Sequence, residues 1–80
     1  MKTSHLPQTP QELDAFIARF ESDLQDVPTS GLQMGLQFQQ MRQAQIERNG
    51  VTTPSEELNH TYTLRKIGAY VSVLMDRNEL

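Results

Sequence analysis

The stretch that decides the fold is 54-PSEELNHTYTLRKIGAYVSVLM-75, the longest helical pattern in the chain. Thr53 precedes it as a candidate N-cap, and Pro54 suits the first helical position. Glu56 stands three residues after Thr53, where its carboxylate can reach back and complete a capping box. We therefore expect one long helix over about residues 54–76, roughly 33 Å in length at about 1.5 Å per residue.

This helix is apolar on two nearly opposite sides when its residues are placed about 100° apart. A helix on the surface of a monomer needs only one apolar side, and an 80-residue chain is small for surrounding a helix. Two sides indicate either a helix central to the fold or a helix that meets another chain, and we favour the second interpretation. The first stripe contains Leu58, Tyr62, Ala69 and Val73, and the second contains Leu64, Ile67, Val71 and Leu74.

A first helix is predicted over about residues 10–26. The segment Thr9-Pro10-Gln11-Glu12 repeats the cap, proline and returning glutamate of the long helix. Pro28 ends this helix, because the residue before a proline avoids the helical region. The apolar residues at i, i+3, i+4, i+7 and i+11 predict packing against the long helix. They are Leu13, Phe16, Ile17, Phe20 and Leu24.

A second helix is predicted over about residues 30–49, where Asn49-Gly50 is a strong stop signal. It is also apolar on more than one side. Six glutamines surround its apolar residues, and two interpretations stay open: exposed helix surface, or a polar layer that hydrogen-bonds across an interface. Leu32, Leu36 and Ile46 share one direction, and Met34, Phe38 and Met41 share the other.

The short connections between these helices are typical of antiparallel neighbours. The sequence thus predicts an all-α fold, a small three-helix up-down-up bundle that associates through its second and third helices. Residues 1–8 contain little to bury and are predicted to be a mobile lead-in. Residues 9–80 are predicted to form a single helical domain.

Composition narrows the functional classes. A formal net charge of −3 argues mildly against a nucleic-acid or anionic-membrane partner. The absence of Cys removes thiol nucleophiles, redox motifs and zinc fingers. No apolar run approaches the ~20 residues that span a bilayer, and the first residues lack the apolar core of a signal peptide. We expect a cytoplasmic protein with no membrane partner.

Catalytic and metal-binding patterns are weak in this sequence. The Ser and Thr residues belong to no motif with a His and a carboxylate, and the glycines are scattered. His60 lies four residues after Glu56 and could share a metal with it, but zinc normally takes three or four protein ligands. The other interpretations of His60 are a pH-sensitive contact at an interface and a packed residue with no special role. We expect no enzymatic activity, no cofactor and no metal.

These observations predict a small non-enzymatic helical protein–protein interaction module, a homodimer that serves a larger protein as a regulator, adaptor or chaperone-like binder. The alternative is a DNA-binding transcriptional regulator that uses the second and third helices. That alternative would present Glu56 and Glu57 to phosphates at the start of its recognition helix. The predicted partner or dimer interface consists of Met34, Phe38, Met41, Leu64, Ile67, Val71 and Leu74.

Overall fold

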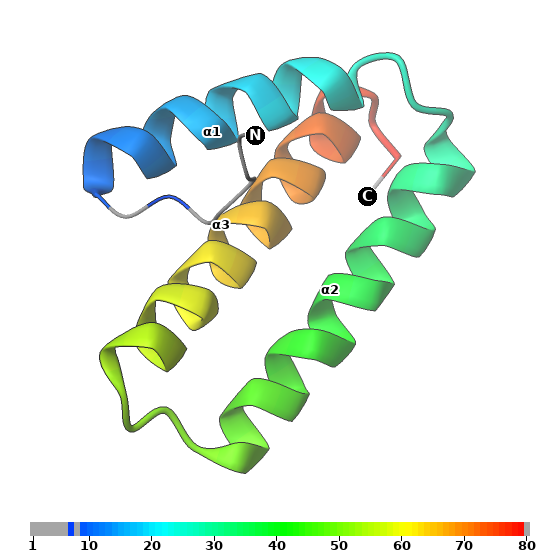
Figure 1. The fold of residues 1–80 in the computed structure, drawn as a ribbon. Helices are drawn as coiled ribbons and strands as arrows, with labels where there is room; N and C mark the ends of the chain where they lie inside the picture. The colour runs from blue at the N-terminus through cyan, green and yellow to red at the C-terminus, as the bar shows by residue number, and fades with distance from the viewer. Residues whose placement is uncertain (1–6, 8, 80) are drawn as a thin grey trace, which may run out of the picture.

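The computed structural model describes residues 7 and 9–79, and this part of the chain forms three α-helices. Helix α1 spans Pro10–Leu24, α2 spans Thr29–Asn49 and α3 spans Pro54–Asp76. Helix α3 packs against both other helices, and α2 lies along its length (Figure 1). The prediction of a small all-α three-helix bundle is confirmed.

The predicted lead-in lies almost entirely outside the described residues. Of residues 1–8 the structure describes only Pro7, which is buried. The helix boundaries agree with the predicted ones within one residue, except at the end of α1.

Helix α2 runs antiparallel to α3 and comes very close to it. Gly35 lies against the ring of Tyr70, and further along α2 the carboxylate of Glu47 lies 3.0 Å from the imidazole of His60. A Cβ atom on Gly35 would stand 2.5 Å from Cε1 of Tyr70, a distance that real Cβ contacts do not reach. The absence of a side chain at Gly35 is therefore what lets the Tyr70 ring lie against the backbone of α2.

Helix α1 runs parallel to α3 along a row of aromatic contacts. The ring centroids of Phe16 and Tyr62 are 5.1 Å apart, and those of Phe20 and Tyr70 are 5.5 Å apart in an edge-to-face arrangement. Lys66 places its ammonium 4.6 Å from the Tyr62 ring centroid, within cation–π range. Since residue numbers rise together along both helices, the three helices follow an up-down-up order.

Both predicted start signals form as capping hydrogen bonds. The Oγ1 atom of Thr9 accepts from the Glu12 amide at 3.1 Å, and that of Thr53 accepts from the Glu56 amide at 3.1 Å. The carboxylate of Glu56 in turn accepts from the amides of Thr52 and Thr53, at 2.9 and 3.0 Å. The start of α3 is therefore a complete capping box.

The capping box makes the stability of α3 sensitive to acid. Hydrogen bonds from the Thr52 backbone first, then from the Thr52 hydroxyl and the Thr53 backbone, lower the pKa of Glu56 below its ordinary value of 4.5. A carboxyl whose pKa is lower in the folded state stabilises the fold above pH 4.5, and this contribution is lost as the pH falls through the folded value. We expect Glu56→Gln to lower the melting temperature near neutral pH and to have little effect in strong acid.

A matched control for this prediction is Glu57→Gln, because Glu57 also lies in the first turn of α3. Its carboxylate interacts with the same helix dipole but is not part of the capping box. Circular-dichroism melts near neutral pH and in strong acid compare the two variants. If both substitutions lower the melting temperature by the same amount at neutral pH, the capping hydrogen bonds are not the source of the effect.

Helix α1 ends two residues before the predicted position, at Leu24. The chain tightens there, since the amides of residues 25–27 donate to carbonyls three residues back. The guanidinium of Arg77 then binds the carbonyls of Leu24 and Gln25, at 3.2 and 3.0 Å, and the hydroxyl of Thr29 at 3.2 Å. One side chain after α3 thus joins the end of α1 to the start of α2, and the sequence offered no local signal for it.

Replacing Arg77 with Ala should lower the free energy of unfolding by about 2 kcal/mol, because hydrogen bonds to a charged group contribute roughly 1.5–3 kcal/mol in total here. The melting temperature should fall by roughly 10 °C for a chain of this size. Arg77→Lys should not restore it, since one ammonium cannot reproduce the forked geometry of a guanidinium. Urea unfolding measures the effect. The control is Arg19→Ala, which removes an exposed arginine from α1. If it lowers the free energy of unfolding by the same amount, the hydrogen bonds of Arg77 are not the source of the effect.

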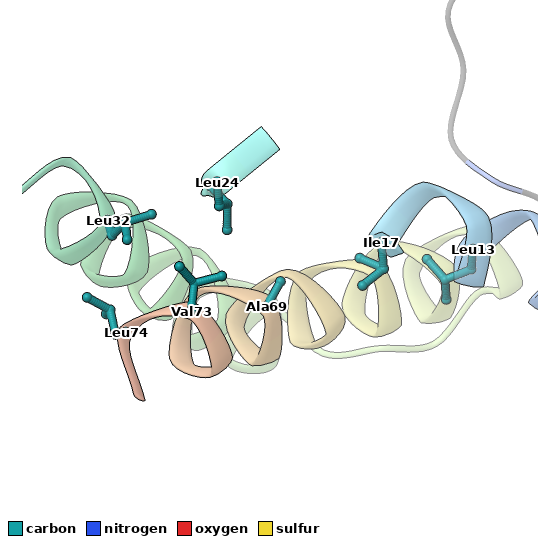
Figure 2. Packing of buried hydrophobic residues seen from close by; sticks show 7 residues of the cluster. All are labelled: Leu13, Ile17, Leu24, Leu32, Ala69, Val73 and Leu74. Carbon is teal, nitrogen blue, oxygen red and sulfur yellow. The ribbon is translucent and has the colours of Figure 1, made fainter. Parts of the chain in front are cut away.

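The core follows α3 and has contributions from each helix (Figure 2). At one end Leu24 and Leu32 surround Val73, and at the other end Leu13 and Ile17 cover the N-terminal half of α3. The apolar stripe predicted for α1 therefore packs as expected, with its two phenylalanines half-buried beside the core. The buried apolar residues are Leu13, Ile17, Leu24, Leu32, Ala69, Val73 and Leu74.

Leu74 corrects one interface prediction. We expected it at a partner surface, but only 1% of it is exposed. It lies about 80° around α3 from Leu64, because the ten intervening steps of about 100° leave this offset. That difference brings Leu74 under the start of α2, where the buried Leu32 also lies. Leu74 is a core residue of the single chain.

Of the two interpretations of the glutamines of α2, exposed helix surface fits most of them, and a polar layer that hydrogen-bonds across an interface stays a prediction. Gln39 is buried, with 6% of it exposed, and its Oε1 atom has no hydrogen-bond partner among the described residues. Gln43 donates to Glu47 at 3.1 Å, and Glu47 in turn lies 3.0 Å from His60. These bonds, led by the one with His60, lower the pKa of Glu47. The contact across to α3 is made by Glu47, no glutamine hydrogen bond to another helix is found among the described residues, and Gln33, Gln37, Gln40 and Gln45 are exposed.

Candidate interaction surface

Three large apolar side chains stand exposed on one side of α2. The exposed fractions are 71% for Met34, 61% for Phe38 and 66% for Met41. Met34 follows the buried Leu32 by two residues, and Met41 follows the buried Gln39 by two. At about 100° per residue, both methionines therefore point away from α3. We name these three residues, Met34, Phe38 and Met41, the α2 patch.

A second exposed apolar group lies on α3. Leu64 is 41% exposed and Met75 is 59% exposed, and Val71 between them is half-buried. Met75 was not among the predicted interface residues, although its spacing of i+11 from Leu64 places it on the same side of the helix. We name Leu64, Val71 and Met75 the α3 patch.

The predicted interface residues are therefore not brought together into one surface. The α2 patch points away from α3, so it lies on a different side of the bundle from the α3 patch. Ile67 is half-buried and Leu74 is in the core. Helical spacing identified the direction of each side chain on its own helix, but the position of the neighbouring helix decided which side chains stay exposed.

Two arginines extend the α2 patch. The lining of a depression of about 340 Å³ includes Phe38, Met41, Arg42 and Arg48. Neither arginine forms a salt bridge within the part of the chain that the structure describes. The charge of Arg42 also contributes, after burial, to the lowered pKa of Lys66. The surface beside the apolar side chains thus carries the positive charges of Arg42 and Arg48.

A wider depression of about 880 Å³ opens between the first turns of α1 and α3. Its lining includes Leu13, Leu58 and Thr61, and Arg65 at its edge is paired with Asp14 at 2.9 Å. Its lining has hydroxyl groups but no His or Cys. The arrangement offers an apolar surface without a nucleophile and base in hydrogen-bond contact.

Other site chemistry is limited in the described residues. No three His, Cys, Asp or Glu side chains among them lie close enough together to hold a metal ion. None of the three helices combines the length and the apolar character needed to cross a membrane. His60 contacts Glu47 across the α2–α3 contact, so its one described partner is a carboxylate of the same chain.

Comparisons of the chain with protein-family models, with curated proteins and with solved structures find no match.

Proposed function

We propose that this chain is a non-enzymatic helical protein–protein interaction module, and that the α2 patch is its contact surface. The observation that carries the proposal is the exposure of three neighbouring large apolar side chains on the outward side of one helix. Contiguous exposed apolar surface is typical of interaction sites. Burial of a Met or Phe side chain contributes about 1.5–3 kcal/mol, so covering three of them offers a gross gain of several kcal/mol toward association.

The scaffold behind the patch supports this role. Helix α2 is fixed to α3 by the buried Leu32, by the close approach of Gly35 to Tyr70 and by the bond between Glu47 and His60. Because these contacts hold the inward side of α2 in place, the helix loses little further conformational entropy when a partner binds its outward side. Methionine adapts its shape to a partner, and two of the three patch residues are methionines. The roles that we propose for the chain are those of a regulator, adaptor or chaperone-like binder of a larger protein.

The DNA-binding alternative has one observation in its favour, that Arg42 and Arg48 on α2 form no salt bridge with any residue that the structure describes. Against it, the first turn of α3 presents Glu56 and Glu57, and α1 and α2 cover two sides of α3. Binding to duplex DNA at increasing salt distinguishes the two functions, because phosphate contacts release counterions and weaken steeply with salt. We expect no such binding.

The interaction function is tested by photo-crosslinking in the cells from which the chain comes. A photoreactive phenylalanine analogue replaces Phe38 in one variant and the exposed Gln40 of the same helix in a control variant. The two positions differ by about 200° around α2. We expect position 38 to give defined protein adducts, identified by mass spectrometry, and position 40 to give none of them. Equal labelling at both positions, or no adduct at position 38, would contradict the proposal.

A further inference from the structure

We infer that the partner that fits the α2 patch is a second copy of this chain, with the two α2 helices packed antiparallel about a two-fold axis near Phe38. The inference rests on the proposed function, because it names the occupant of the same surface. It is carried by two features of α2, the order of its exposed apolar residues and the position of Arg48, which forms no salt bridge among the described residues.

The apolar residues determine where the axis lies. In a two-fold antiparallel pair, each residue faces one that is equally far from the axis on the other copy. An axis between Gln37 and Phe38 places the two Phe38 side chains together, one on each side of it, and it sets Met34 of each copy opposite the partner's Met41. Every residue of the α2 patch then meets an apolar residue. An axis near Met41 would instead set Met34 against the partner's Arg48, leaving an apolar side chain against a charge.

The charges match at the same axis. Arg48 follows Phe38 by ten residues, which is about 15 Å along the helix. With the axis between Gln37 and Phe38, Arg48 falls opposite position 27 of the partner, in the turn that joins α1 to α2. Asp26 lies in this turn, is exposed, and forms no salt bridge among the described residues. In the inferred dimer each Arg48 therefore lies at the level of the partner's α1–α2 turn, where the exposed Asp26 offers a carboxylate for an ion pair at each end.

The inferred pairs of Arg48 with Asp26 also offset an unfavourable interaction between Arg48 and the partner's helix dipole. An arginine at the N-terminal end of a partner helix would be repelled by the positive end of the helix dipole. A carboxylate at Asp26 offsets this repulsion. Ion pairs at the rim of an interface fix orientation and register more than affinity, so the apolar residues hold the dimer and the charges select its antiparallel arrangement.

The experiment uses charge reversal, with sedimentation velocity of the full chain over a range of micromolar concentrations. Arg48→Glu places two carboxylates together at each end, and Asp26→Arg places two guanidiniums together. Each single variant should weaken dimerisation by about tenfold or more. The double variant R48E/D26R should dimerise like wild type, because both pairs are restored in reverse. An equimolar mixture of the two single variants should form the mixed dimer, in which every end pair is attractive.

Circular dichroism establishes that all variants keep their helices, which is expected because both positions are exposed. A wild-type chain that stays monomeric throughout the range overturns the inference, and so does a dimer that none of the charge reversals weakens. These results are distinct from failure of the proposed function. If the wild-type chain is monomeric but position 38 crosslinks to a different protein, the second copy is the wrong occupant and the contact surface stands. If position 38 gives no adduct at all, the surface itself is wrong.

Discussion

Replacing Leu74 with Ala should lower the free energy of unfolding by about 2–5 kcal/mol, a large fraction of the stability expected for a chain of this length. Only 1% of Leu74 is exposed, so truncation removes buried methyl groups and leaves a cavity between α2 and α3. The next residue provides the control. Met75 is 59% exposed, and Met75→Ala should change stability by no more than about 0.5 kcal/mol.

Urea unfolding followed by circular dichroism measures both variants, at concentrations low enough that association does not contribute. If Leu74→Ala unfolds the chain outright, the milder Leu74→Val gives a measurable value. Equal effects at the two positions would mean that α3 is rotated relative to the arrangement described here, and that Leu74 faces outward as the sequence alone suggested.

Replacing Gly35 with Ala should destabilise the chain by about 1–3 kcal/mol, although Ala is the better helix former. The new Cβ atom would lie 2.5 Å from Cε1 of Tyr70. The Tyr70 ring is held edge-on against Phe20, so relieving the clash disturbs the contacts with both α1 and α2. Thermal and urea unfolding measure the loss.

Gly68→Ala is the matched control, because a Cβ atom on Gly68 meets nothing within 4 Å. In that variant only helix propensity changes, and it should stabilise the chain by up to about 1 kcal/mol. The same substitution is thus expected to have opposite signs in α2 and α3. In a Tyr70→Ala background the clash is gone, and Gly35→Ala should become neutral or stabilising. If Gly35→Ala stabilises the wild-type chain as Gly68→Ala does, α2 and α3 are not in close contact at this point.

The parts of the fold that sequence could predict are those set by local chemistry. The caps at Thr9 and Thr53 depend on residues three positions away, and the stop at Gly50 depends on one glycine with a φ of 93°. The apolar stripe of α1 has one side only, so its packing direction had no competing interpretation.

The parts that sequence could not predict depend on residues far apart in the chain. Arg77 reaches carbonyls 52 and 53 positions away, and no spacing rule connects them. The two apolar sides of α3 indicated surplus surface, but α2 covers the side with Leu74 and leaves Leu64 and Met75 exposed. Periodicity gives the angle of a side chain on its helix, whereas burial depends on where the next helix lies. An isolated glycine within a helix marks a candidate for close packing, but Gly68 carries the same mark and a Cβ atom there meets nothing within 4 Å, so the sequence alone does not single out Gly35.

The candidate surface was only half predictable for the same reason. Met34, Phe38 and Met41 share one side of α2 by spacing alone, and their exposure follows the predicted direction. The division of the seven predicted residues between two surfaces and the core required the arrangement of the helices. The pairing of Arg48 with a second copy required both the axis at Phe38 and the position of the α1–α2 turn.

The most direct test of the central claim, that a second copy covers the α2 patch, is sedimentation velocity of the wild-type chain beside Phe38→Glu at matched micromolar concentrations. Phe38 is 61% exposed, so the variant should fold normally and lose only the contact between copies. We expect the wild-type chain to sediment as a dimer that dissociates on dilution and the variant to sediment as a folded monomer. A wild-type monomer at every concentration, or a variant that dimerises as well as the wild type, would contradict the claim.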